Sequence, residues 1–166
     1  ESSGLVHRLK RTGYQKYLCK LLDKYEINDA VVFTGFLNEQ QMAERCAKSN
    51  VYVLPSCIEN SPNSLCEAML MGVPSVASDV GGVPSLLESG KDGFLYPFDE
   101  PYMLAYRVMQ LFSDEQLAKN LSNNARIRAL DRHDRQLNGE TMYQIYHQIA
   151  DNRGKRRNEK NTIHGV

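Results

Sequence analysis

The stretch from Val51 to Asp79 constrains the fold of this chain more than any other part of the sequence. The apolar run 51–54 predicts a short buried strand. After a polar loop, residues 63–71 place apolar side chains at helical spacing, and a glycine and a proline then end the helix. Because a second apolar run follows at once at 75–77, the stretch predicts the strand–loop–helix–strand unit of a parallel sheet.

The same alternation of strands and helices extends along most of the chain. The predicted strands are residues 31–34, 51–54, 75–77 and 94–96. The predicted helices are residues 14–25, 39–48, 63–71, 83–89, 102–112, a helix capped by Asp114, and 135–149 with Leu137, Met142, Ile145, Tyr146 and Ile149 on its apolar face. Short apolar strands between amphipathic helices indicate the α/β class, a parallel sheet covered by helices on both faces.

The expected domain occupies residues 14–150, after a polar segment 1–13 and before a basic tail 151–166. A domain of this type opens with a strand, and the first residues carry no strand signal. We therefore expect at least one N-terminal strand to be missing from this chain, which would leave an unpaired edge or slot.

Two carboxylates lie within the organising stretch, Glu59 in the loop and Glu67 in the first turns of the helix. The loop between them leads to a helix N-terminus, where free backbone N–H groups bind anions. An ionised carboxylate at such a place can accept two hydrogen bonds from the hydroxyl pair of a ribose. Two plainer interpretations stay open: Ser64 and Glu67 could form a capping box, and Glu59 could be a solvated loop acid.

Glycines mark two other predicted strand ends. Gly81 and Gly82 follow the strand at 75–77, and Gly35 follows the strand at 31–34. The pair at 81–82 permits positive φ and close approach of the backbone to a ligand, or it forms a tight turn that needs no ligand. Because ligands of parallel sheets bind outside the carboxyl ends of the strands, we expect Gly35, Glu59 and the glycine pair to converge on one rim.

Composition sets the remaining limits. With 166 residues, 42% of them apolar and 24% charged, the chain is long enough for one globular domain with a sizeable core. Twenty basic and twenty acidic residues cancel, so nothing in the overall charge points to nucleic acid. The four cysteines lack C-x-x-C spacing and favour buried thiols in the cytoplasm, and the scattered histidines give little support to a metal site.

Four motifs in order carry a resemblance to a known family. Glu59-x7-Glu67, followed by Ala68-Met69-x-x-Gly72-x-Pro74, resembles the E-x7-E segment of the family 4 retaining glycosyltransferases, which have the GT-B fold. The segments 32–36, 79–84 and 90–95 are similar to the strand and loops that flank this segment in the family. The resemblance covers about residues 14 to 130.

The resemblance implies that the chain is the C-terminal, Rossmann-like half of a GT-B enzyme, which binds a nucleotide-diphosphate sugar. Glu67 would bind the ribose, and Glu59 would contact the transferred sugar near the reacting carbon as the catalytic-site residue. The other implied donor-binding residues are Asn63, Ser64 and Leu65 at the diphosphate or sugar hydroxyls, Gly35 and Phe36 at the base, and Gly81 and Gly82 in the second loop.

The implied reaction moves a sugar from a UDP-, GDP- or ADP-linked donor to a glycan or glycolipid, with no metal or other cofactor. The acceptor domain and a basic pair that stabilises the leaving diphosphate would precede Glu1, so the chain alone would be inactive. Lys155, Arg156 and Arg157 could touch the cytoplasmic face of a membrane, although a solvated tail is the simpler expectation. Two other functions stay open: a non-catalytic nucleotide-binding or interaction module, and a nucleotide-sugar epimerase.

Overall fold

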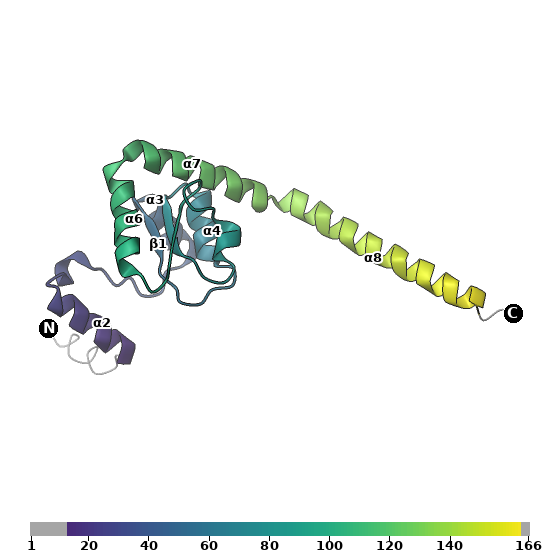
Figure 1. Cartoon of the computed structure of the whole chain (residues 1–166), viewed down its shortest axis with the longest axis horizontal. Helices are drawn as coiled ribbons and strands as arrows, with labels where there is room; N and C mark the ends of the chain where they lie inside the picture. Colours follow the sequence, from purple (N-terminus) through teal and green to yellow (C-terminus); the bar gives the residue numbers. More distant parts are fainter. Residues whose placement is uncertain (1–12, 164–166) are drawn as a thin grey trace. The chain divides into compact units, whose positions relative to one another are not determined.

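The computed structural model describes the backbone of residues 13–163 and the side chains of residues 13–152. The chain divides after Asn38 into two units, Glu1–Asn38 and Glu39–Val166 (Figure 1). The first unit contains the helix α2 (Gly13–Lys24) and the short 3₁₀ helix η1 (Asn28–Ala30). The second unit contains all the β-structure of the described residues.

The sheet consists of β1 (Tyr52–Leu54), β2 (Ser75–Ser78) and β3 (Phe94–Tyr96). The strand order within the described residues is β1-β2-β3, and both pairs are parallel. Val53 pairs with Val76, which in turn pairs with Phe94. The predicted α/β class and three of the four predicted strands are therefore confirmed.

The predicted strand at 31–34 is wrong. Its residues have no ladder partner within the described part of the chain, and the side chains of Val32 and Phe33 are 72% and 64% exposed. A β-branched apolar run favours a pleated, half-buried surface, and it forms a strand only where a neighbouring strand supplies hydrogen-bond partners. No described strand pairs with this run, and the outer edge of β1 is likewise unpaired among the described residues.

Helices connect and cover these strands. They are α3 (Glu39–Ala47), α4 (Asn63–Leu70), α5 (Val83–Leu86), α6 (Pro101–Ser113) and α7 (Glu115–Arg132). A further helix, α8 (Arg135–Ile163), follows α7 and has exposed side chains throughout residues 135–152. Asp114 caps α7 as predicted, because its carboxylate accepts the N–H of Leu117 at 2.9 Å. The element types predicted for these segments are confirmed.

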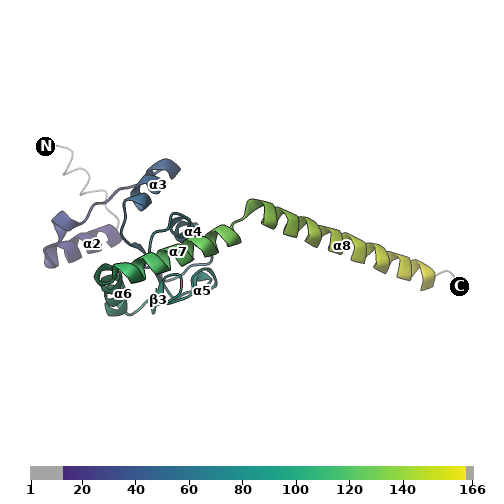
Figure 2. The same cartoon turned by 90° about the horizontal axis from the view of Figure 1, so that it is seen from above.

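The core lies on both faces of β2, whose four residues are all buried. On one face Ala77 packs with Leu65 and Met69 of α4 and with the later part of α7. On the other face Val76 packs with Phe94 and with residues of α6 and early α7. Figure 2 shows α7 running past both α6 and α4. The central strand is thereby fixed from both sides, which makes its carboxyl end a rigid base for a site.

Helix α4 ends as the sequence predicts. Gly72 has φ +71°, its N–H donates to the Met69 carbonyl, and the N–H of Val73 donates to the Ala68 carbonyl. This pair of bonds is the Schellman arrangement, which a glycine in the left-handed region allows. The hydroxyl of Ser122 on α7 donates to the Gly72 carbonyl at 2.5 Å and ties the helix end to α7.

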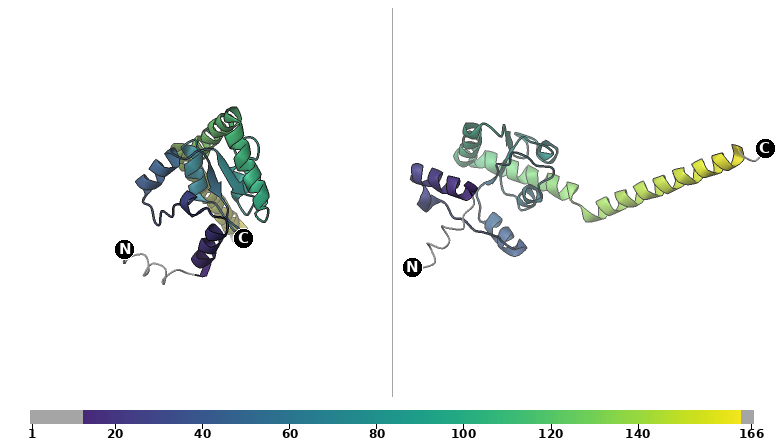
Figure 3. Two further views of the ribbon diagram at one scale, coloured as in Figure 1. Left: turned by 90° about the vertical axis from the view of Figure 1, so that its left-hand side faces the viewer. Right: turned by 90° about the horizontal axis from the view of Figure 1, so that it is seen from below.

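Helix α8 is longer than predicted. It continues past Ile149 to Ile163, so most of the expected tail 151–166 is helical (Figure 3). The part of the tail up to Ile163 contains no proline, and its lysines, arginines and glutamate are good helix formers that outweigh Gly154. Leu137, Met142, Ile145, Tyr146 and Ile149, expected to form an inward apolar face, are exposed. Within the described residues, no helix has both the length and the apolar character that a membrane span requires.

Candidate functional site

The loops that follow β1 and β2 meet at the carboxyl ends of these strands. The Ser78 hydroxyl, at the end of β2, donates to the Ser56 carbonyl at 2.6 Å. Further along, the Gly82 N–H donates to the Glu59 carbonyl at 3.4 Å. The predicted convergence of Glu59 with Gly81 and Gly82 on one rim is therefore confirmed.

Gly81 and Gly82 allow this contact because they lack side chains. A Cβ on Gly81 would collide with the carbonyl oxygen of Glu59, and a Cβ on Gly82 would collide with that of Asn60. Gly81 also has φ +53°, in the left-handed region that glycine populates freely. The close backbone approach expected at this pair is thus made by the Glu59–Asn60 segment of the chain itself.

Glu59 is half-buried, and its carboxylate has a defined partner. The hydroxyl of Ser56 donates to Oε1 of Glu59 at 2.7 Å. This is a short bond to an acceptor that carries charge when ionised, the stronger class of protein hydrogen bond. The loop thus holds one oxygen of Glu59, while the side chain keeps part of its exposure to solvent.

Helix α4 begins directly after this loop, with Pro62 as its N-cap residue and no side-chain cap. The N–H groups of Leu65 and Cys66 donate to the Pro62 carbonyl, while those of Asn63 and Ser64 donate to no acceptor within the described chain. Unpaired N–H groups in the first turn carry the partial positive charge of the helix dipole. The helix therefore presents an anion-binding end beside Glu59.

The capping-box interpretation of Ser64 and Glu67 is wrong. Ser64 is the second residue of α4 and not its cap, and its hydroxyl accepts a hydrogen bond from the phenol of Tyr52 at 2.8 Å. Glu67 is exposed, and its carboxylate makes no hydrogen bond or ion pair with any described residue. Glu67 is thus free to accept hydrogen bonds from a ligand.

Glu67 lines a pocket of about 280 Å³. The other lining residues are Glu39 and Ala43 of α3 and Leu70 and Met71 at the end of α4. Helices α3 and α4 therefore form this pocket, and the loops after the strands do not line it. Cys46 of α3 packs against Ala68 of α4 and holds the two helices together.

Tyr52 is a site residue that the sequence did not reveal. Burial raises the pKa of its phenol above the ordinary value of 10.0, and the hydrogen bond to Ser64 partly offsets this rise. The charges of Glu59 and Glu67 also raise this pKa, so the phenol feels both carboxylates. A tyrosine in an apolar strand is a signal for a buried hydroxyl that needs a partner. Here the partner is the first turn of α4.

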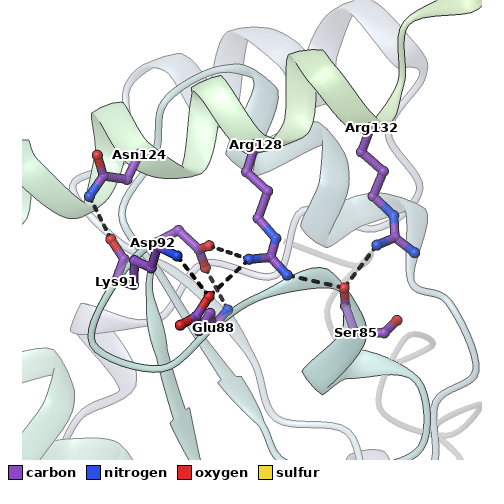
Figure 4. A network of polar contacts seen from close by, with 7 residues as sticks. All are labelled: Ser85, Glu88, Lys91, Asp92, Asn124, Arg128 and Arg132. Atoms are coloured by element: carbon purple, nitrogen blue, oxygen red, sulfur yellow. Dashed lines mark hydrogen bonds and ion pairs between the residues drawn. The ribbon is translucent and has the colours of Figure 1, made fainter. Parts of the chain in front are cut away.

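An ion-pair network joins α7 to the segment between α5 and β3, at the amino ends of the parallel strands (Figure 4). Asp92 is 2% exposed; its carboxylate accepts the N–H of Glu88 at 2.6 Å and pairs with Arg128 at 2.9 Å. Arg132 donates to the carbonyl of Ser85 at 2.8 Å. Asp92, buried just before β3, therefore ties the start of this strand to α7.

The remaining predicted site residues lie in the first unit. Gly35 has φ +65°, which agrees with a glycine turn, and Phe36 is 97% exposed. Both belong to Glu1–Asn38, so their proposed place beside a nucleotide base stays a prediction. Among the described residues, no three His, Cys, Asp or Glu side chains are grouped so that they could hold a metal ion. Cys46 and Cys66 are buried as expected, whereas Cys57 is exposed.

The chain is similar to a known family over most of its length. The sequence model of the family described as Glycosyl transferases group 1 matches residues 11–128. Over 109 residues the chain is 33% identical to N-acetyl-alpha-D-glucosaminyl L-malate synthase of Bacillus anthracis, a match that covers 66% of this chain and 28% of that protein.

Two solved structures share the fold at higher coverage. Sucrose-phosphate synthase from Thermosynechococcus elongatus has a TM-score of 0.76 and 27% identity over 86% of this chain and 36% of its own. HepE of Anabaena in complex with UDP-glucose has a TM-score of 0.68 and 28% identity, again over 86% of this chain and 38% of its own. The chain thus spans well under half the length of each of these proteins.

Proposed function

The chain belongs to the family Glycosyl transferases group 1, as its motifs indicated, and on that premise we propose that it binds the nucleotide-diphosphate sugar from which the whole protein transfers a sugar. The acceptor in this proposal is a glycan or a glycolipid. The family match and the complex of HepE with UDP-glucose support the donor class. The parallel sheet of the second unit is the expected α/β half of a GT-B glycosyltransferase.

One observation carries the proposal. The N-terminus of α4 has unpaired N–H groups, and the same loop–helix segment carries two carboxylates, one held by a hydrogen bond and one without a described partner. The unpaired N–H groups of Asn63 and Ser64 offer hydrogen bonds and partial positive charge to a diphosphate. Glu59, braced by Ser56, stands on one side of this helix end, and Glu67 stands one turn along the helix. A nucleotide-diphosphate sugar has a matching order of parts, with the diphosphate between sugar and ribose.

Each residue then has a proposed role. Glu59 contacts the transferred sugar near the reacting carbon, and Glu67 accepts the ribose hydroxyls. The first turn of α4, from Asn63 to Leu65, binds the diphosphate. Gly81 and Gly82 hold the loop of Glu59 in place and thereby shape the sugar side of the site. Gly35 and Phe36 border the base in this proposal.

Binding of the donor needs no metal in this proposal, since backbone N–H groups and the helix dipole meet the diphosphate directly. Calorimetric titration with UDP, GDP and ADP in excess chelator tests this. We expect one of the three to bind at millimolar concentration or below, and the affinity to fall with salt because partly exposed charges are screened. Failure of all three to bind would overturn the proposal and leave an interaction module as the better interpretation.

Sugar transfer by the chain alone is not expected. The matched relatives are more than twice as long as this chain, and the proposal places the acceptor surface and the basic pair in the rest of the protein. A transfer assay with radiolabelled UDP-glucose and simple glycan acceptors tests this part separately. Turnover by the isolated chain would refute it without affecting the donor-binding proposal.

A further inference from the structure

The two carboxylates of the site differ in how they are held. Glu67 makes no hydrogen bond with a described residue, whereas Oε1 of Glu59 accepts the Ser56 hydroxyl at 2.7 Å. Oε2 of Glu59 accepts from no described group. One oxygen of Glu59 is thus engaged by the loop, and the other is left for a ligand hydroxyl.

Ser56 is in turn fixed by the sheet. Its carbonyl accepts the Ser78 hydroxyl at 2.6 Å, and Ser78 is fully buried at the carboxyl end of β2. Strand β2 is the central strand of the described sheet and is packed on both faces. Two short hydrogen bonds therefore connect the most rigid strand to the Glu59 carboxylate.

We infer that Ser56, held by Ser78, is a positioning residue that fixes the Glu59 carboxylate for contact with the donor sugar. The inference rests on the proposed function, because it takes Glu59 as the residue that meets the sugar. A glutamate side chain in a loop has several rotamers of similar energy, and holding one of them before the ligand arrives raises affinity for the part of the ligand that Glu59 touches. The nucleotide part, bound by α4, should be unaffected.

The competing explanation is that Ser56 simply braces the loop. Loss of a structural brace would weaken the nucleoside diphosphate and its sugar ester alike, because the loop leads directly into α4. Loss of a positioning contact would weaken only the sugar ester. The ratio of the two affinities therefore separates the explanations, whereas either affinity alone would not.

The experiment measures the affinity of the whole chain for the nucleoside diphosphate that it binds and for the corresponding glucose ester. The variants are Ser56→Ala, Ser56→Thr, Ser78→Ala and Glu59→Ala, with Ser113→Ala as the matched control because Ser113 is exposed at the end of α6. We expect Ser56→Ala to weaken the glucose ester about tenfold, the usual effect of losing a hydrogen bond to a charged group. The diphosphate affinity should stay within about twofold.

The remaining variants test the direction of the effect. Ser56→Thr keeps the hydroxyl and should retain the affinity, and Ser78→Ala should reproduce part of the loss. In the Glu59→Ala background, which removes the acceptor of the Ser56 hydroxyl, Ser56→Ala should add nothing, because a residue that acts through Glu59 has no effect once that side chain is absent. Thermal unfolding followed by circular dichroism confirms that each variant folds.

Three results would overturn the inference: equal weakening of both ligands by Ser56→Ala, additive losses in the double variant, or an unchanged glucose-ester affinity in Glu59→Ala. The first two results leave the proposed function intact, and the third removes only the sugar contact proposed for Glu59, because nucleotide binding by α4 would remain. Absence of all nucleotide binding by the unmodified chain would instead overturn the proposed function and this inference with it.

Discussion

Replacing Gly82 with alanine tests whether the loops after β1 and β2 form one unit. Gly82 has φ −87°, a backbone conformation that alanine adopts without strain. The only obstacle is the new Cβ, which would overlap the carbonyl oxygen of Asn60 more closely than non-bonded atoms tolerate. The Glu59–Asn60 backbone must therefore move away. Inserting one methyl group into such a packed contact costs about 1–3 kcal/mol of folding free energy.

Gly90→Ala is the matched control. Gly90 has φ +82°, which strains an alanine, but a Cβ there meets nothing within 4 Å. Its cost is the left-handed backbone alone, about 1–2 kcal/mol. The two variants should therefore lose similar stability for different reasons. Only Gly82→Ala should displace the segment that carries Glu59.

Three assays separate these effects. Urea unfolding gives the loss of stability, and amide hydrogen exchange should quicken in residues 56–62 for Gly82→Ala only. Affinity for the nucleotide sugar should fall about tenfold or more in Gly82→Ala, since displacements of about 1 Å in a site have large effects, and should be unchanged in Gly90→Ala. Equal ligand affinity in the two variants would refute the coupling of the loops.

Three further predictions follow from the same structure. Asp92→Ala should lower the free energy of urea unfolding by about 3 kcal/mol, the low end for a broken buried ion pair, because Arg128 is 32% exposed. Glu115→Ala, which breaks an exposed ion pair, should lower it much less. Equal losses would contradict a stabilising role of the Asp92–Arg128 pair. Stability should fall above about pH 9 in a urea-midpoint series. Burial raises the pKa of Cys46 and Tyr52 in the folded chain. Their contribution to stability is therefore complete below the unfolded pKa values and is lost as pH rises through the folded pKa values. If a Cys46→Ala, Tyr52→Phe variant loses stability equally steeply with pH, these two groups are not the cause. Nucleotide affinity should fall by less than about twofold in excess chelator but several-fold between about 50 and 500 mM salt, because salt screens partly exposed charges. Loss of binding in chelator would show that a metal takes part.

Local chemistry made much of the second unit predictable. The strands at 51–54, 75–77 and 94–96 were recognisable because each is apolar and ends at a turn residue, and both faces of the sheet are covered. Gly72 marked the end of α4 because a Schellman arrangement needs a left-handed residue. The spacing of Glu59 and Glu67 indicated that the loop after β1 and the start of α4 form the candidate site at the carboxyl ends of the strands.

Other features depended on partners that a linear pattern does not contain. The run at 31–34 has strand composition but no described pairing partner, so composition alone misled. Gly81 and Gly82 were ambiguous from sequence because the atoms they accommodate belong to residues more than twenty positions earlier. The pairing of Asp92 with Arg128 joins residues 36 positions apart, and nothing in the glycine-rich segment around Asp92 indicates it.

The capping box failed for a similar reason. Serine followed three residues later by glutamate fits the motif, but Pro62 is the N-cap residue, so Ser64 lies inside the helix and bonds to Tyr52. The helix start decided between two interpretations that the residue spacing allowed equally. This helix start matters for the proposed donor site, because it leaves both the first-turn N–H groups and the Glu67 carboxylate available to a ligand.

The affinity of the Glu67→Ala variant for the nucleotide tests the proposed donor site most directly. Glu67 is exposed and unpaired among the described residues, so its removal should not alter folding. Glu140→Ala, on exposed α8, is the matched control. The proposal predicts that Glu67→Ala weakens the nucleotide about tenfold or more, the effect of losing hydrogen bonds to a charged acceptor, while Glu140→Ala has no effect. Equal affinities of the unmodified chain and the Glu67→Ala variant would contradict it.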